Sequence, residues 1–309
     1  MKVLVLGAGA VGSYFGGRLA LAGHDVTFIG RKAHVEAIRD RGLTIDSKVT
    51  GKHTVSVAAS ETLLASKPPD LVLLCVKSYD TEATAQSLKE FIAPQTVVLC
   101  LQNGIDNHEV AGAVLGHNRV HPTVIYVGVR IPEPGVVEHV ARGEITLPEE
   151  LSALAPVFQQ AGIPAKTSDN ILGVVWSKLL LNASCNALGM ICAISFGDMV
   201  KNAEMREVIS GAVDEVVRVA GAKGIRIPGE NYAAQVIKTC ESLGPGLSSM
   251  LQDHRAGKRL EIEALNGIVV NLGKRFNIQT PYNATFYAIA KAFADKSAGS
   301  PNAGIKPAV

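Results

Sequence analysis

The sequence predicts an α/β fold, in which an N-terminal Rossmann-type, doubly wound sheet is followed by a second, all-helical domain. In the first half, apolar runs of strand length alternate with helical patterns, and a GxGxxG motif follows the first of these runs. After the polar cluster at 167–170, strand-like runs stop and helical patterns continue to about Ala294. We therefore expect domains at 1–170 and 171–295, and a disordered tail at 296–309, which lacks apolar periodicity.

Composition limits the class of protein. A chain of 309 residues suits two domains better than one core. The 30 Lys and Arg residues nearly balance the 28 Asp and Glu residues, so charge gives no case for a nucleic-acid or membrane partner. The 5 cysteines are odd in number and widely spaced, which predicts neither a disulfide framework nor a metal site and favours the cytoplasm.

The glycine motif predicts a dinucleotide site. The strand-like run Lys2 to Leu6 leads directly into Gly7-Ala8-Gly9-Ala10-Val11-Gly12, which opens a helical pattern. Gly7 permits the tight turn, Gly9 lets the backbone approach a pyrophosphate, and Gly12 brings the helix close to the strand. We expect these six residues to bind a cofactor whose phosphates sit at the helix N-terminus.

The second strand-like run, at 25–29, indicates which nicotinamide cofactor is bound. An NAD enzyme would place Asp or Glu at its end, but this chain has Gly30-Arg31-Lys32. Arg31 can hold a 2′-phosphate in a bidentate fork and Lys32 can add a charge, which favours NADP. The alternative is an ordinary solvated basic turn.

Two further runs, at 70–76 and 96–101, end at Lys77 and at Asn103. Ligands of open α/β sheets bind at the carboxyl ends of the strands, so both residues are candidates for contacting the ribose or nicotinamide. The alternatives are a solvated lysine and an ordinary Asn-Gly turn. Short runs at 124–129, 136–140 and 144–147 predict hairpin strands that extend the same sheet, where His139 has a structural role.

A polar stripe marks the second half. Lys178, Asn182 and Asn186 recur every four residues within an apolar run, so a helix would carry an ammonium and two carboxamides on one face. A buried ammonium is costly unless it has a function, although the stripe could also lie on the surface. The apolar stretch 179–197 is nearly long enough to cross a bilayer, but its Asn and Ser residues favour a buried helix pair.

An acidic residue follows further along the chain. In a helix over 260–267, Glu261 shares a face with Ala264 and Leu265, whereas Glu263 lies with Asn266. Glu261 is therefore the acid expected to turn inward. The alternative is a solvated helix charge.

Taken together, these motifs resemble the ketopantoate reductase family over nearly all of residues 1–295. The resemblance rests on the glycine motif, Lys77, Gln102-Asn103-Gly104, the stripe from Lys178 to Asn186, the run from Ser248 to Asp253, Glu261-Ile262 and Asn266-Gly267. It implies a Rossmann domain joined to a helical domain, and NADPH-dependent reduction of 2-dehydropantoate to (R)-pantoate in the pantothenate and coenzyme A pathway.

The resemblance also implies residue roles. Lys178 matches the catalytic acid, Glu261 its acidic partner and Arg31 the 2′-phosphate ligand. The groups that hold substrate or nicotinamide match Asn103, Asn182, Asn186 and Ser249, and further cofactor contacts are expected from Lys77, Asn103 and Glu261. Residues 187–198 and the proline-containing hairpin follow the family only loosely, which leaves the substrate preference open.

The expected chemistry agrees with these residue types. Hydride transfer to a ketone builds negative charge on the carbonyl oxygen, which an ammonium can stabilise and protonate. A related β-hydroxyacid or opine-type dehydrogenase, a paralogue acting on another branched 2-oxo acid, and a non-catalytic NADPH-sensing module are the alternatives. Apolar helices in the second half could support a homodimer.

Overall fold

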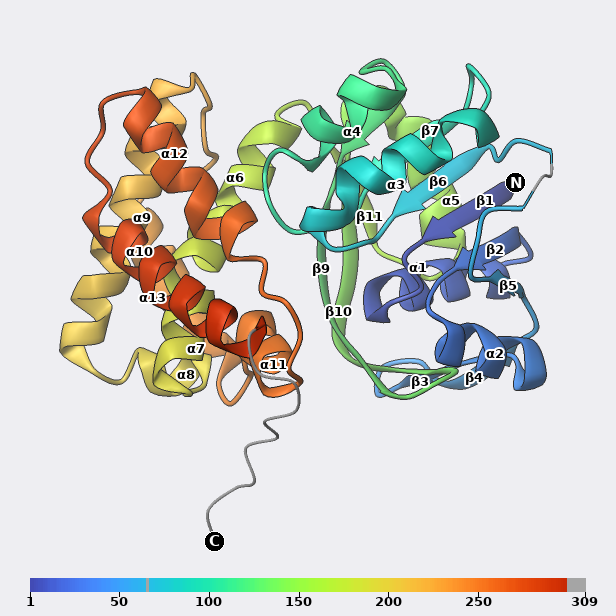
Figure 1. Cartoon of the computed structure of the whole chain (residues 1–309), viewed down its shortest axis with the longest axis horizontal. Coiled ribbons are helices and arrows are strands. Elements are labelled where there is room, and N and C mark those ends of the chain that lie inside the picture. The colour runs from blue at the N-terminus through green and yellow to red at the C-terminus, as the bar shows by residue number, and fades with distance from the viewer. Residues whose placement is uncertain (65–66, 299–309) are drawn as a thin grey trace, which may run out of the picture. The chain divides into compact units, whose positions relative to one another are not determined.

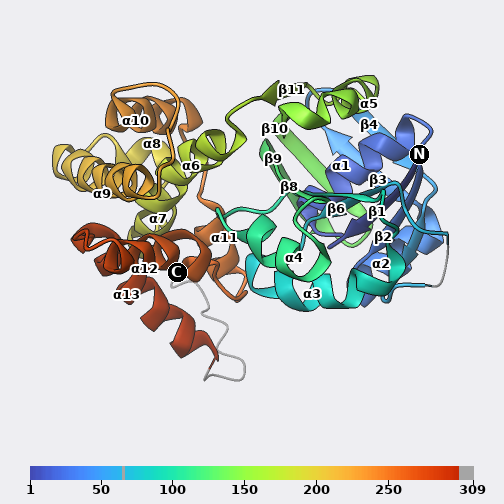
Figure 2. The same cartoon turned by 90° about the horizontal axis from the view of Figure 1, so that it is seen from above.

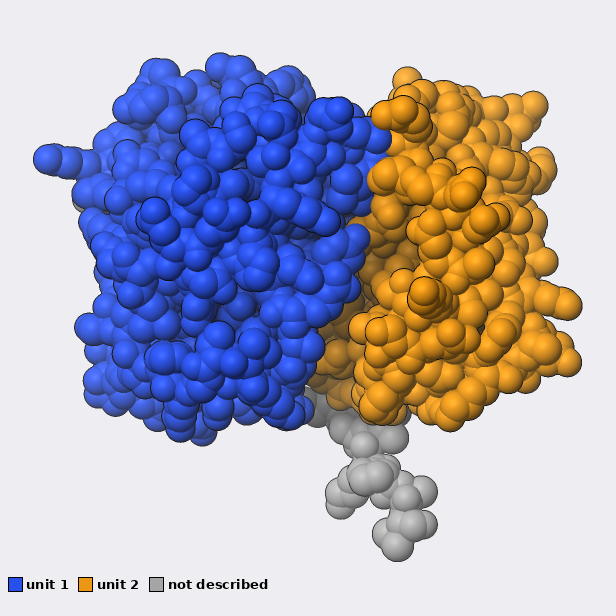
Figure 3. All heavy atoms as spheres, turned by 180° about the vertical axis from the view of Figure 1, so that it is seen from behind, with its two compact units in different colours: residues 1–175 blue, residues 176–309 orange. Residues whose placement is uncertain are grey.

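The computed structural model describes residues 1–64 and 67–298, and the chain divides into two compact units. Unit 1 comprises residues 1–175 and unit 2 comprises residues 176–309, coloured separately in Figure 3. Helix α6 (Ile171–Leu181) spans this division, which lies close to the expected boundary near Asn170.

Unit 1 is built on a six-stranded sheet in which every neighbouring pair is parallel (Figure 1). In spatial order its strands are β5 (Ala58–Ser60), β2 (Asp25–Ile29), β1 (Lys2–Leu6), β6 (Leu71–Leu74), β7 (Val97–Cys100) and β8 (Val120–Pro122). The strand order reverses between β1 and β6, so this is the doubly wound topology that the sequence predicts.

Both faces of this sheet are buried, which explains why its strands are continuous apolar runs. In β1, Val3 and Val5 belong to the same core as Phe15 of α1 (Ala10–Leu21). Leu4 and Leu6 point to the opposite core. The helices that line the first core are α1, α2 (Lys32–Arg41) and α5 (Ala155–Gln160), and those that line the second are α3 (Thr81–Leu88) and α4 (Asn107–Leu115).

A second sheet of five strands completes unit 1, and it corrects the prediction for the hairpin. The strands are β11 (Ala165–Ser168), β10 (Val136–Pro148), β3 (Leu43–Ser47), β4 (Gly51–Val55) and β9 (Val124–Glu133). The hairpin β9–β10 therefore pairs with β3 and β11 and does not extend the parallel sheet. Ile45, Val137 and Ile145 share the core that contains α1, so this sheet covers the outer side of that helix.

Several short elements connect the strands of unit 1. They are the 3₁₀ turns Ser78–Asp80, Lys89–Phe91 and Glu149–Leu154, and helix α5 (Ala155–Gln160). His139 is buried in β10, where its ring contacts the Ser47 hydroxyl at 2.8 Å and the Arg142 carbonyl at 2.8 Å. These contacts give His139 a structural role, as predicted.

The described part of unit 2 contains helices and no strand, which confirms the second half of the fold prediction (Figure 2). Following α6, the elements are the π-helix η4 (Asn182–Asn186), α7 (Ala187–Cys192), α8 (Phe196–Met199), α9 (Ala203–Ala222), α10 (Tyr232–Leu243), α11 (Ser249–Arg255), the π-helix η5 (Glu263–Gly267), α12 (Ile268–Arg275) and α13 (Pro281–Ala298). Helix α13 extends into the segment predicted to be a disordered tail, and residues 299–309 of that segment lie outside the described residues.

The two π-helices depart from the regular 3.6-residue period that the sequence suggests. In a π-helix each N–H bonds to the carbonyl five residues earlier, so the turn is wider than in an α-helix. Asn182 and Asn186 begin and end η4. Glu261 lies before η5 and outside any helix, which corrects the continuous helix expected over 260–267.

The apolar stretch from Ile171 to Cys192 is long enough to span a bilayer, but 67% of its most apolar window is buried within the protein. It is therefore a core segment, in agreement with the prediction of a buried helix pair.

The first turn of α13 is held by Glu215 of α9, a carboxylate that is 1% exposed. That carboxylate accepts hydrogen bonds from the backbone N–H groups of Tyr282 and Asn283, both at 2.9 Å.

Candidate active site

The glycine motif forms a tight turn between β1 and α1. Gly7 has φ +96°, a region that favours glycine, and the N–H groups of Gly7 and Ala8 both donate to the Ile29 carbonyl, at 3.0 and 2.9 Å. A Cβ on Gly12 would lie 2.3 Å from the Gly7 carbonyl oxygen, so only glycine lets the helix approach the strand this closely. The first and third glycines therefore have the structural roles predicted for them.

The middle glycine faces open space. A Cβ on Gly9 would meet no heavy atom within 4 Å, and Gly9 is the exposed N-cap of α1, where no side chain caps the helix. The first turn of a helix presents N–H groups without helical partners and a positive dipole end. This turn therefore fits a pyrophosphate, with room for a phosphate beside Gly9.

Arg31 lies just beyond the end of β2, as the N-cap residue of α2, and is exposed. A Cβ on Gly30 would lie 2.7 Å from the Ala8 Cβ, so the start of α2 is next to the glycine turn. Lys32 forms only a weak pair with Glu36, at 3.9 Å between exposed groups. Cationic side chains therefore occupy the position where an acidic residue would bind a ribose 2′-hydroxyl.

A buried histidine ties this region together. The Gly135 N–H donates to His34 Nδ1 at 2.9 Å, which leaves the proton on Nε2 to donate to the Ser13 hydroxyl at 3.0 Å. Burial lowers the pKa of His34 and so favours the neutral ring that these two bonds require. His34 thus links α1, α2 and the β9–β10 hairpin, a contact that no local sequence pattern indicates.

The loop that carries Lys77 lies beside the glycine turn. The Cys75 N–H donates to the Leu6 carbonyl at 2.7 Å, and a Cβ on Gly7 would lie 2.7 Å from the Val76 nitrogen. This is the point where the strand order reverses, at which open α/β sheets bind ligands. The structure therefore brings half-buried Lys77 to the same edge as the glycine motif.

Asn103 belongs to the next loop along that edge, and its backbone is firmly held. Its carbonyl accepts a hydrogen bond from the Ser78 hydroxyl at 2.9 Å and another from the Asn107 carboxamide at 2.7 Å. Thr81 donates to the Asn107 oxygen at 2.9 Å. Ser78, Thr81 and Asn107 were not predicted as site residues, although the polar run that follows each strand is a sequence signal for them.

Unit 2 carries the second group of predicted residues. Lys178 is half-buried near the end of α6, and η4 follows with Asn182 at 8% and Asn186 at 3% exposure. The Asn186 carboxamide nitrogen lies 3.3 Å from the Asn182 carboxamide oxygen, so these two side chains share a face. The two asparagines are therefore buried, and the alternative of a surface stripe is wrong for them.

The predicted serine and glutamate belong to two later segments of unit 2. Ser248 is buried, caps α11 and donates from its hydroxyl to the Asn186 carbonyl at 3.0 Å. Ser249, the predicted substrate ligand, is the exposed first residue of α11. Glu261 is 8% exposed whereas Glu263 is exposed, so the inward acid is the one predicted, although it precedes the helix.

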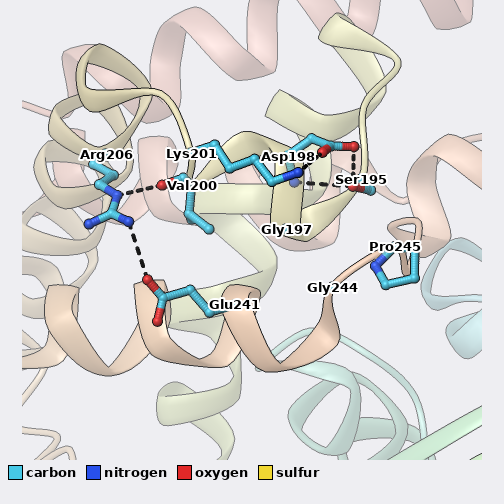
Figure 4. A pocket seen from close by; sticks show the side chains of 9 residues that line it. All are labelled: Ser195, Gly197, Asp198, Val200, Lys201, Arg206, Glu241, Gly244 and Pro245. Carbon is cyan, nitrogen blue, oxygen red and sulfur yellow. Dashed lines mark hydrogen bonds and ion pairs between the residues drawn. The ribbon is translucent and has the colours of Figure 1, made fainter.

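A separate hollow of about 400 Å³ lies in unit 2 and is shown in Figure 4. It is lined by Ser195, Gly197, Asp198, Val200, Lys201, Arg206, Glu241, Gly244 and Pro245. Its cations are paired, Lys201 with Asp198 at 2.7 Å and Arg206 with Glu241 at 3.2 Å. This hollow contains no predicted site residue and offers no excess charge for an anionic ligand.

The fold and the glycine turn define a two-domain, dinucleotide-binding protein of the oxidoreductase type. Comparison with known families then identifies it more closely. Residues 3–150 match the family model for ketopantoate reductase PanE/ApbA, and residues 170–294 match the model for its C-terminal domain. The chain belongs to the ketopantoate reductase family, whose members are oxidoreductases that use a nicotinamide cofactor.

Individual relatives agree over nearly the whole chain. A 2-dehydropantoate 2-reductase from Pyrococcus horikoshii is 35% identical and aligns with 97% of this chain and 100% of its own length. The crystal structure of a PanE/ApbA family ketopantoate reductase from Ralstonia eutropha has a TM-score of 0.91 at 39% identity, covering 96% of this chain and 100% of that one. A D-mandelate dehydrogenase with NADH and anilino(oxo)acetate has a TM-score of 0.88 at 25% identity, covering 96% and 100%.

Proposed function

We propose that this protein reduces 2-dehydropantoate to (R)-pantoate with NADPH, the reductive step of the pathway to pantothenate and coenzyme A. The observation that carries the proposal is the buried carboxamide pair, Asn182 and Asn186, four and eight residues after Lys178. Curated relatives named 2-dehydropantoate 2-reductase, at 30–35% identity over nearly full length, support the same substrate.

In the proposed reaction Lys178 is the general acid. The bound dihydronicotinamide supplies a hydride to the ketone carbon. The Lys178 ammonium stabilises the charge that develops on the carbonyl oxygen and donates a proton from Nζ to that oxygen. Glu261, which is buried, is proposed to bind the substrate hydroxyl and to keep Lys178 charged.

The carboxamides are proposed to hold the substrate. Because a carboxamide both donates and accepts, Asn182 and Asn186 suit a molecule that has a carboxylate and hydroxyl groups. Ser249 is exposed and can add a contact to the carboxylate, and Asn103 in unit 1 is proposed to contact substrate or nicotinamide. The bonds to the Asn103 carbonyl support this role, because they fix the loop that presents its side chain.

The preference for NADPH rests on Arg31. Its guanidinium is exposed next to the glycine turn and can clamp a 2′-phosphate in a bidentate fork, with Lys32 as a second cation. Lys77 is proposed to contact the ribose, since its loop adjoins the glycine turn.

We further infer a homodimer, for which α13 offers a surface. Tyr282, Ile289 and Phe293 lie on one side of this helix and are 38–40% exposed. Light scattering on the purified protein measures the mass directly, and a monomeric mass at micromolar concentration would reject this part of the proposal.

A second candidate is the reduction of a different 2-oxo acid. The D-mandelate dehydrogenase relative favours it, because its structure has the same fold and contains NADH with an oxo-acid compound. An aromatic oxo acid such as phenylglyoxylate would then be the better substrate.

The test is cofactor oxidation by the purified enzyme, followed by absorbance, with NADPH and NADH in parallel. The substrates are 2-dehydropantoate, phenylglyoxylate and unbranched pyruvate. We expect kcat/KM to be highest for 2-dehydropantoate with NADPH, by about tenfold or more. A higher value for phenylglyoxylate would favour the second candidate, and no turnover with any 2-oxo acid would reject both.

A further inference from the structure

The pair Asn266-Gly267 belongs to the motifs of the family resemblance, yet it has no part in the proposed chemistry. Asn266 is 0% exposed within η5. Its carboxamide nitrogen donates to the Ala183 carbonyl of η4 at 2.8 Å and to the Asn283 carboxamide oxygen of α13 at 3.0 Å. Both hydrogens of one buried NH₂ group are therefore used to join three helical segments.

The Ala183 carbonyl lies directly after Asn182, in the wide turn of η4. A π-helical turn is a short interruption of α-helix and is frequent at functional sites. The bond from Asn266 reaches this turn from another element, and it ends on the carbonyl of the residue that follows Asn182, one of the two proposed substrate carboxamides.

The other end of this link is anchored. Asn283 donates from its own carboxamide to the Ala212 carbonyl at 3.1 Å and to the Glu215 carboxylate at 2.7 Å, both in α9. Because Glu215 also accepts the first N–H groups of α13, Asn283 cannot shift without breaking several buried bonds. The chain of contacts therefore runs from α9 through Asn283 and Asn266 to η4.

We propose that Asn266 is a positioning residue that fixes η4, and hence Asn182 and Asn186, for substrate binding. Gly267 completes the arrangement, since a Cβ there would lie 2.9 Å from the Glu263 carboxylate and 3.0 Å from the Tyr287 ring. The inference rests on the proposed function for its kinetic consequence. The structural part, that Asn266 holds η4, stands apart from any substrate.

The test compares Asn266→Ala with Tyr287→Phe. Both changes remove contacts of η5 to α13, but the Tyr287 hydroxyl bonds to Glu263 and Lys291 at the surface, at 2.8 and 3.1 Å. In Asn266→Ala we expect KM for the 2-oxo acid to rise about tenfold or more while KM for NADPH stays within about twofold. In Tyr287→Phe both constants should stay within about twofold of wild type.

These readouts separate positioning from loss of stability. Irreversible loss of folded enzyme lowers kcat per total enzyme and leaves both KM values unchanged, whereas reversible unfolding raises the apparent KM for NADPH together with that for the 2-oxo acid. A second variant, Asn266→Asp, keeps the side-chain shape and regains one donor when its carboxyl is protonated. Relative to wild type, its KM for the 2-oxo acid should improve as pH falls, which Asn266→Ala should not show.

A measurement without substrate distinguishes this inference from the proposed function. Hydrogen exchange at the backbone amides of residues 183–188 should be at least about tenfold faster in Asn266→Ala than in wild type or Tyr287→Phe. Equal exchange and an unchanged KM in Asn266→Ala would overturn the positioning role. An inactive wild type would overturn the proposed function and leave the exchange result as the test of this inference.

Discussion

Substituting Gly9 and Gly12 separately tests whether the glycine turn binds the cofactor. In Gly9→Ala the added Cβ meets no heavy atom within 4 Å, and the Gly9 backbone, at φ −81° and ψ −169°, is open to alanine. The main cost is a poorer N-cap, about 0.5–1 kcal/mol, which lowers Tm by a few degrees. The methyl group instead occupies the space proposed for a phosphate, so the Kd for NADPH should rise by about tenfold or more.

Gly12→Ala should act mainly on stability, whereas Gly9→Ala should act mainly on NADPH binding. Its Cβ would lie 2.3 Å from the Gly7 carbonyl and 2.9 Å from the Val5 side chain, so α1 must move away from β1. Overpacking of this kind costs about 1–3 kcal/mol or more. Thermal unfolding gives the stability of each variant and titration of nucleotide fluorescence gives the Kd. If Gly9→Ala binds NADPH within about twofold of wild type, the pyrophosphate does not lie against Gly9 and the reasoning is refuted.

Three further predictions concern other residues. Arg31→Asp should raise KM for NADPH far more than KM for NADH in steady-state assays, and equal losses with both cofactors would refute the 2′-phosphate role. Glu215→Leu should lower the free energy of unfolding by about 3–5 kcal/mol in a denaturant titration, because three N–H groups, two of them buried, lose their acceptor; a loss below about 1 kcal/mol would contradict this. Since burial lowers the pKa of His34 below its ordinary 6.5, the unfolded state binds more protons, and the stability that His34 contributes is complete above about pH 6.5 and declines below it. The fall in Tm between about pH 7.5 and 5.5 should therefore be smaller in His34→Asn than in wild type, and an equal fall would show that another group is responsible.

The parts of the fold that local patterns determine were predictable. The run Lys2 to Leu6, followed at once by Gly7, Gly9 and Gly12, specifies a strand, a turn and a helix without any distant contact. The strand ends at Lys77 and Asn103 could also be placed, because parallel strands bring their carboxyl ends to one edge. Glu261 is the buried acid, as predicted, but the helix on which that prediction was based begins only after Glu261.

The parts that depend on distant contacts were not predictable. The partner strands of the β9–β10 hairpin, β3 and β11, lie elsewhere in the chain, and no local pattern reveals that pairing. A four-residue spacing such as Asn182 to Asn186 fits an α-helix and a π-helix alike, and the bond from Asn266 to Ala183 joins residues 83 positions apart. Only the folded structure displays such contacts.

The central claim is that Lys178 donates the proton in reduction of a 2-oxo acid, and the single-turnover rate of Lys178→Ala tests it most directly. With NADPH bound beforehand and 2-dehydropantoate added, cofactor oxidation should be slower than in wild type by at least about 100-fold. The Kd for NADPH should stay within about twofold, because the expected cofactor turn lies in unit 1. A rate within about threefold of wild type would contradict the account, since the reaction would then have another acid.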